Sequence, residues 1–161
     1  MLRLTPRLLL TVVSLACAAS VGLALVAQHR YGMEPCPWCI LQRMLFVLLA
    51  VIGLVAAALP SLGRRLLSGV ALLGAMGGMA AALWQHFVAA QSASCALTLA
   101  DRIISATGLD VRWPEAFEVR ASCADAAVSV LGVPFELWSL ALFALTGVVL
   151  LVNVLASGRR A

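Results

Sequence analysis

Residues 66–100 read LLSGVALLGAMGGMAAALWQHFVAAQSASCALTLA and contain no Asp, Glu, Lys or Arg. A helix needs about 20 predominantly apolar residues to cross the hydrocarbon core of a bilayer. We therefore expect a membrane-spanning helix over about residues 67–88 of this segment. Its many Gly and Ala residues would let a neighbouring helix approach closely, as small residues do in membranes.

Three further segments are apolar and long enough to span a bilayer, over about residues 8–28, 40–59 and 137–156. We therefore predict an all-α membrane protein, a four-helix transmembrane bundle that forms one integral membrane domain over residues 1–161. The first apolar run is longer than the roughly 7–15 residues of a signal-peptide core, so we expect it to remain as an uncleaved helix.

The composition excludes several classes of protein. Hydrophobic residues make up 63% of the chain and charged residues 11%, and the mean hydropathy is +1.06. Soluble domains are about 25% charged, so this chain is neither an ordinary soluble domain nor a disordered protein. All 11 basic residues are Arg, and they do not gather into one basic face, so nucleic acid is not an expected partner.

The distribution of charge predicts the orientation in the membrane. Six Arg residues flank the apolar segments on one side, where no acidic residue occurs: Arg3, Arg7, Arg64, Arg65, Arg159 and Arg160. Basic flanks stay in the cytoplasm. We therefore place both termini and the 60–65 turn in the cytoplasm, and the loops over about residues 28–39 and 89–136 on the outer side.

The long outer loop contains a weak helical pattern. Apolar residues recur at helical spacing from Leu97 to Thr107, with Asp101 and Arg102 on the other side and Gly108 as a stop. The pattern indicates a short interfacial helix on the membrane surface, with an irregular loop as the alternative.

Four of the five cysteines fall on the outer side: Cys36, Cys39, Cys95 and Cys123. Cys17 lies within the first apolar segment and is most simply a small core residue. Three interpretations compete for the outer four. Inert disulfides that staple the loops are one. A zinc site is the second, although Cys95 and Cys123 are too far apart to form a second close ligand pair. Redox chemistry is the third.

The Cys36–Cys39 spacing favours redox chemistry. A Cys-x-x-Cys bridge closes a very small loop and therefore gains little from loop-closure entropy, so it is better explained as a pair that opens and closes. Pro37 suits the first turn of a helix, which places Cys39 near a helix N-terminus that favours a thiolate.

Arg43 follows Cys39 by four residues and should lie on the same helix face, about one turn deeper. A charged residue within a membrane span indicates a functional site, with snorkelling to the head groups as the alternative. A thiolate with a nearby cation would suit a lipid-soluble electron acceptor whose oxygens become negative on reduction.

The run Cys36-Pro37-Trp38-Cys39-Ile40-Leu41-Gln42-Arg43, with four spans and a later outer pair Cys95 and Cys123, resembles the disulfide bond formation protein B (DsbB) family. The likeness covers nearly the whole chain and includes Leu131-Gly132 and Trp138. Val128 stands where the family usually has Trp, and Pro134 is displaced from its usual place; both departures concern local packing.

The resemblance implies a bacterial inner-membrane enzyme that reoxidises a periplasmic DsbA-like dithiol oxidase and passes the electrons to a quinone, either ubiquinone or menaquinone. By position, Cys95 and Cys123 would form the disulfide that the partner attacks, and Cys36 and Cys39 the pair that reduces the quinone. The resemblance also implies Arg43 and His86 as neighbours of the quinone. No metal is expected.

Two other classes of protein stay open from the sequence. A vitamin K epoxide reductase-like enzyme is also a four-helix thiol protein coupled to a quinone, but its Cys-x-x-Cys lies in a late span. The second alternative is a non-catalytic protein with four spans and structural disulfides.

Overall fold

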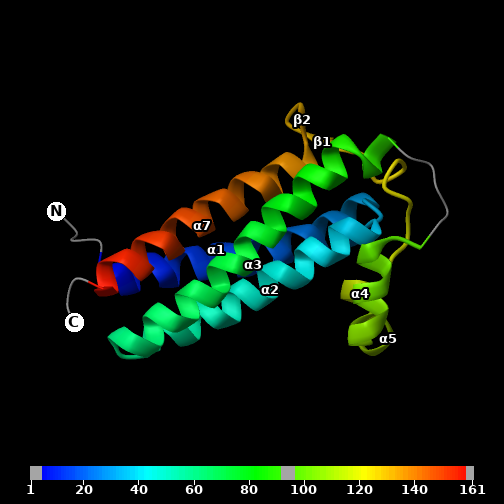
Figure 1. Cartoon of the computed structure of the whole chain (residues 1–161). Helices are drawn as coiled ribbons and strands as arrows, with labels where there is room; N and C mark the ends of the chain where they lie inside the picture. The colour runs from blue at the N-terminus through cyan, green and yellow to red at the C-terminus, as the bar shows by residue number, and fades with distance from the viewer. Residues whose placement is uncertain (1–4, 92–96, 159–161) are drawn as a thin grey trace.

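A computed structural model of the chain describes residues 5–91 and 97–158, and of 157 and 158 only the backbone. Four long helices lie side by side: α1 (Pro6–Tyr31), α2 (Pro37–Ala58), α3 (Ser61–Phe87) and α7 (Phe135–Gly158) (Figure 1). Each is long and apolar enough to cross a membrane. The predicted four-helix transmembrane bundle is therefore confirmed.

The four long helices form a closed ring. Helix α1 packs against α2, α2 against α3, α3 against α7, and α7 returns to α1. The start of α1 and the end of α7 lie at the same end as the connection between α2 and α3 (Figure 1). Arg7, Arg64 and Arg65 belong to that end, whereas Arg3, Arg159 and Arg160 lie outside the described residues. The assignment of this end to the cytoplasm stays a prediction.

Local signals fix the ends of the helices. In α1, the Thr5 side chain accepts a hydrogen bond from the Leu8 N–H, Pro6 occupies the first turn, and Gly32 ends the helix in the left-handed region with φ 64°. Helix α3 begins earlier than predicted, at Ser61, so Arg64 and Arg65 lie in its first turns and not in a connecting turn. Pro60 precedes the helix, and no residue after it prevents helix formation.

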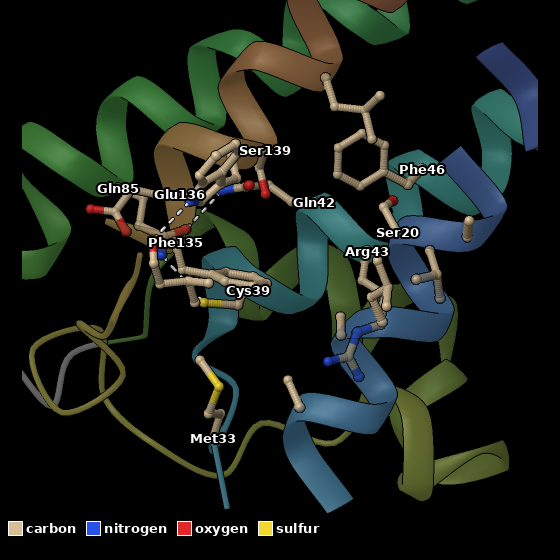
Figure 2. A pocket seen from close by; sticks show the side chains of 18 of the residues that line it. Ser20, Met33, Cys39, Gln42, Arg43, Phe46, Gln85, Phe135, Glu136 and Ser139 are labelled. Atoms are coloured by element: carbon tan, nitrogen blue, oxygen red, sulfur yellow. Dashed lines mark hydrogen bonds between the residues drawn. The ribbon is translucent and has the colours of Figure 1, made fainter. Parts of the chain in front are cut away.

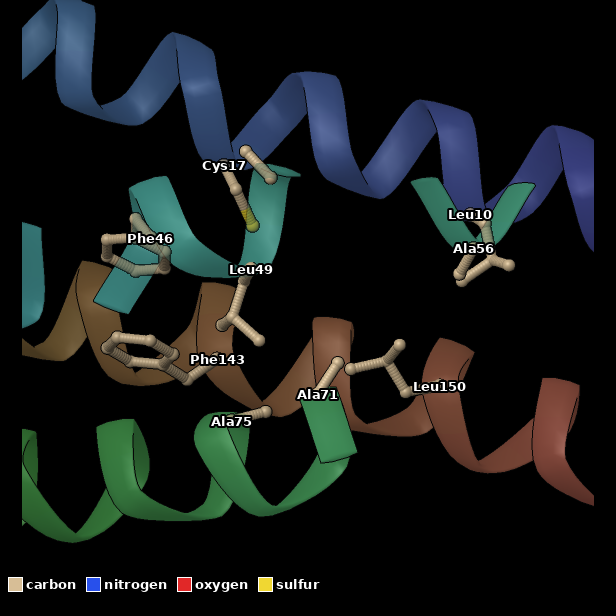
Figure 3. Close-up of a cluster of buried hydrophobic side chains, with 10 residues drawn as sticks. Leu10, Cys17, Phe46, Leu49, Ala56, Ala71, Ala75, Phe143 and Leu150 are labelled. Carbon is tan, nitrogen blue, oxygen red and sulfur yellow. The ribbon is translucent and has the colours of Figure 1, made fainter. Parts of the chain in front are cut away.

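Small residues set the distance between helices, as Figure 3 shows around Phe143. The rings of Phe46 and Phe143 are stacked with centroids 4.0 Å apart, and a Cβ added at Gly78 would lie 2.3 Å from the Phe143 ring. Gly53 in the same way receives the Ser14 hydroxyl. Cys17 is fully buried in this cluster, as expected for a core residue.

The outer segment packs onto the start of α2. A one-turn 3-10 helix (η1, Ala89–Gln91) follows α3, and the chain then forms α4 (Leu99–Thr107), α5 (Leu109–Arg112) and α6 (Pro114–Phe117). Helix α4 confirms the predicted short helix. It begins at a capping box between Thr98 and Asp101 and ends at Gly108. Ile104 and Phe117 form a buried cluster with Ile40, which joins this segment to α2.

A small hairpin that the sequence analysis did not predict precedes α7. Its strands are β1 (Ser129–Val130) and β2 (Val133–Pro134). Leu131 and Gly132 connect them with φ of 55° and 78°, the positive pair that a tight type I′ turn requires. The Trp138 indole donates to the Val130 carbonyl at 3.2 Å and thereby holds the hairpin against α7.

Candidate active site

Cys36 and Cys39 lie at the N-terminus of α2. Cys36 is the N-cap residue, and its Sγ accepts a hydrogen bond from the Cys39 N–H at 3.2 Å. Pro37 occupies the first turn, as predicted. Both cysteines are free thiols in this structure. The cap geometry keeps the two sulfur atoms on neighbouring positions of one helix end.

Cys123 lies beside this pair although it is far away in the sequence. The N–H groups of Arg120 and Ala121 donate to the Pro35 carbonyl at 3.0 and 3.3 Å, which fixes the loop at the start of α2. Cys123 is buried in one cluster with Cys36, and its thiol is also free. Cys95, predicted as its disulfide partner, lies outside the described residues, so this pairing stays a prediction.

Hydrogen bonds at this helix end give Cys36 and Cys123 different acidities. The Cys36 thiol and the Trp38 backbone N–H donate to the Cys123 sulfur, and they lower the pKa of Cys123 below its ordinary value. Donation to Cys123 and Cys39, together with burial, raises the pKa of Cys36. A positive helix N-terminus favours an anion. In the reduced protein, the arrangement therefore favours a thiolate at Cys123 and a protonated thiol at Cys36.

The Cys39 sulfur faces the interior of the bundle. The Gln85 amide donates through Nε2 to Cys39 Sγ at 3.3 Å, and Gln42 Nε2 donates to Gln85 Oε1 at 2.7 Å. Both glutamines are buried. A chain of two amides from α2 and α3 therefore ends on the sulfur (Figure 2).

Arg43 is buried, with 6% of its surface exposed. Its Nη1 donates to Gln28 Oε1 at 3.0 Å and also to the Ala116 carbonyl. The guanidinium is thus held by α1 and α6 and directed to protein partners. Its Nε is buried and has no hydrogen-bond partner among the described residues.

A cavity of about 900 Å³ lies between α1, α2 and α7 and reaches the hairpin (Figure 2). Cys39 and Arg43 both line it, as do Gln42, Gln85 and Glu136. Most of the remaining wall is apolar and comes from α1 and α7, with Phe46 on α2. Cys36 and Cys123 are not among the lining residues. Among the described cysteines, Cys39 is therefore the one that lines the cavity.

His86 does not line the cavity, although the resemblance implied that it neighbours the quinone. Its Nδ1 lies 2.8 Å from Glu136 Oε1, and Glu136 is a lining residue that is itself buried. His86 therefore contacts the cavity wall indirectly, by its interaction with Glu136 of α7.

Four side chains at this site were not predicted from the sequence: Gln28, Gln42, Gln85 and Glu136. The glutamines carried a usable signal, because a polar residue within an apolar span either bonds to another helix or marks a functional site. Which cysteine or arginine each would contact depends on how the helices pack, and the sequence alone does not give that.

A family model and several known proteins match this chain over most of its length. The model of the family "Disulfide bond formation protein DsbB" matches residues 6–153. Disulfide bond formation protein B 1 of Pseudomonas putida is 34% identical over 159 residues, which cover 96% of this chain and 94% of the relative. Disulfide bond formation protein B of Verminephrobacter eiseniae is 36% identical over 160 residues, which cover 97% of this chain and 89% of the relative.

A third relative, disulfide bond formation protein B of Ralstonia nicotianae, is 35% identical over 141 residues, which cover 87% of this chain and 88% of the relative. No solved structure gives a significant match. The family model covers nearly all of the four-helix bundle and the outer loop between α3 and α7. The chain therefore belongs to the disulfide bond formation protein DsbB family.

Proposed function

We propose that this protein is a thiol–disulfide oxidoreductase of the bacterial inner membrane that reoxidises a periplasmic DsbA-like dithiol oxidase and passes the electrons to a membrane quinone. One observation carries the proposal. Cys39 lies next to Cys36 on one side and lines an apolar cavity of about 900 Å³ on the other, and Arg43 lines the same cavity.

The residues that line the cavity fit a quinone. The wall is mostly apolar, as a quinone ring and its isoprenoid tail require, and Arg43 would supply a cationic donor for a carbonyl oxygen. A bound quinone would supply a two-electron acceptor that exchanges with the bilayer. Arg43 and Gln42 would orient it, and the Cys39 sulfur would face it.

Electrons enter through two thiol–disulfide exchanges. A thiolate of the partner attacks the Cys95–Cys123 disulfide and forms a mixed disulfide, which the partner's second thiol resolves. The partner is then oxidised, and Cys95 and Cys123 are reduced. Cys123 is next to Cys36, and the Trp38 backbone N–H donates to its sulfur and favours the thiolate there, so Cys123 attacks Cys36 in the Cys36–Cys39 disulfide and releases Cys39 as a thiolate.

Cys95 then displaces Cys36 from Cys123, which restores the first disulfide and leaves Cys36 and Cys39 reduced. Their oxidation to a disulfide releases two electrons and two protons toward the acceptor. DsbA-type partners are strong oxidants, at about −120 mV, so the acceptor must have a higher potential; each 30 mV corresponds to about 1.4 kcal/mol. This requirement supports a respiratory quinone.

The test uses the purified full-length protein in lipid nanodiscs, a reduced DsbA-like oxidase and a soluble quinone analogue. We expect one partner molecule to be oxidised for each quinone reduced. Cys39→Ser should abolish quinone reduction, whereas Cys17→Ser, which changes a buried core residue, should leave it intact. No quinone reduction by the folded wild-type protein would contradict the proposal and favour a non-catalytic membrane protein.

A further inference from the structure

We propose that Gln85, oriented by Gln42, is the hydrogen-bond donor that stabilises the Cys39 thiolate while Cys36 is bonded to Cys123 and carries no thiol proton. Gln85 touches the reacting sulfur, whereas Gln42 acts through Gln85 and is a positioning residue. The catalytic meaning of this pair rests on the proposed function, but the hydrogen bonds themselves do not.

The contacts determine which way the Gln85 amide points. An amide has one oxygen that accepts and one NH₂ group that donates. The Gln42 NH₂ group donates to Gln85 Oε1 at 2.7 Å, so the oxygen is occupied and the Gln85 NH₂ group faces Cys39 Sγ. A flipped amide would place two NH₂ groups together and an oxygen against the sulfur. Gln42 therefore selects the orientation in which Gln85 donates.

The two amides beside Cys39 are largely shielded from water. Gln42 and Gln85 are 3% and 4% exposed, respectively. Hydrogen bonds to an ionised acceptor are stronger than those between neutral groups, and leaving a buried charge without a partner is costly. Arg43 does not fill this place, because its Nη1 is directed to Gln28 and the Ala116 carbonyl.

The donor matters most at one stage of the reaction. In the reduced protein, the Cys36 thiol is a second donor within reach of Cys39. When Cys123 attacks Cys36, the new Cys36–Cys123 disulfide has no thiol proton, and Cys39 leaves as a thiolate. A more stable thiolate is a better leaving group. Gln85 then remains as the side-chain donor that the structure places on Cys39.

The experiment measures the thiolate of Cys39 directly, without quinone or partner. Full-length Cys36→Ala protein lacks a thiol proton at position 36, as the protein with the Cys36–Cys123 disulfide does. It is reduced in quinone-free detergent, and iodoacetamide alkylation of the Cys39 peptide is followed by mass spectrometry from pH 6 to pH 10. The rate at pH 7 reports the thiolate fraction, and the plateau at high pH reports access of the reagent.

In this background, Gln85→Glu keeps the shape of the side chain and an oxygen that accepts the hydrogen bond from Gln42. It replaces the NH₂ group that donates to Cys39 by a carboxylate oxygen, which accepts. Gln85→Leu removes both polar atoms. We expect each to lower the rate at pH 7 about tenfold, as the loss of one hydrogen bond to a charge would do, with an unchanged plateau. Gln42→Leu leaves Gln85 free to rotate, and it should lower the rate by about threefold.

The matched control is Asn153→Leu, which removes a buried amide roughly five helical turns along α7 from Glu136. Its alkylation profile should equal that of the Cys36→Ala parent. An unchanged alkylation rate at pH 7 in Gln85→Glu would overturn the proposal. A plateau rate at high pH that falls by the same factor as the rate at pH 7 would overturn it too, because access of the reagent would then have changed and not the thiolate fraction. The measurement contains no quinone, so failure of the proposed function would leave this result unaffected.

Discussion

At the scale of single residues, a hydrogen bond from the Cys36 thiol to the Cys123 sulfur makes the acidities of the two cysteines unequal. The Cys36 thiol donates to the Cys123 sulfur and lowers the pKa of Cys123. Cys36→Ala removes this donor, so the pKa of Cys123 should rise and its alkylation at pH 7 should slow by about tenfold in the reduced protein. Mass spectrometry of the Cys123 peptide across a pH series measures this. Cys17→Ala is the control, and an unchanged Cys123 profile in Cys36→Ala would contradict the assignment.

Arg43 is the second residue whose contacts give a direct expectation. Arg43→Ala removes the cationic donor that lines the cavity, so it should lower kcat/KM for the quinone by at least about tenfold, with little effect on exchange between the cysteine pairs. Arg43→Lys should recover part of this loss, because an ammonium lacks the planar fork of Arg. The measurement is the dependence of the rate on quinone at saturating partner.

The control for Arg43 is Arg30→Ala, which changes an exposed arginine on α1. Its quinone kinetics should match those of the wild type. Unchanged quinone kinetics in folded, inserted Arg43→Ala would leave Arg43 with a structural role only.

At the scale of elements, the close approach of α3 and α7 depends on a missing side chain. A Cβ at Gly78 would lie 2.3 Å from the Phe143 ring, which is stacked on Phe46. Gly78→Ala should therefore destabilise the bundle by about 1–3 kcal/mol, the usual cost of overpacking. Gly77→Ala is the matched control, because nothing lies within 4 Å of a Cβ added there. Thermal unfolding in detergent compares the two, and equal stability would contradict the packing argument.

At the scale of the whole molecule, the ends of the bundle differ in charge, and this predicts its orientation. Arg7, Arg64 and Arg65 lie at one end, and Cys36, Cys39 and Cys123 lie at the other. A reporter fused after Gly63 should be active only in the cytoplasm, and one fused at Gly108 only in the periplasm. The opposite pattern would place these cysteines in a reducing compartment and end the disulfide interpretation.

Much of this architecture could be predicted from the sequence, because each feature depends on local pattern. The four helices follow from runs of apolar residues, the position of Cys39 from Pro37, and the end of α4 from Gly108. The contact of Cys123 with Cys36 and the two-amide chain on Cys39 could not be predicted. They depend on how distant segments meet, and neutral polar side chains give no charge pattern that reveals their partners.

The two backbone hydrogen bonds from Arg120 and Ala121 to the Pro35 carbonyl have a kinetic consequence. In the proposed pathway, they would make the attack of Cys123 on Cys36 a reaction within one preassembled unit, where it would otherwise need an encounter between two separate loops. Even a flexible tether gives an effective concentration on the order of millimolar, and a fixed geometry gives more. A small thiol such as glutathione would therefore have to compete with Cys123, which is already positioned next to Cys36. This competition would favour electron transfer from Cys123 to the Cys36–Cys39 pair over loss of electrons to other thiols.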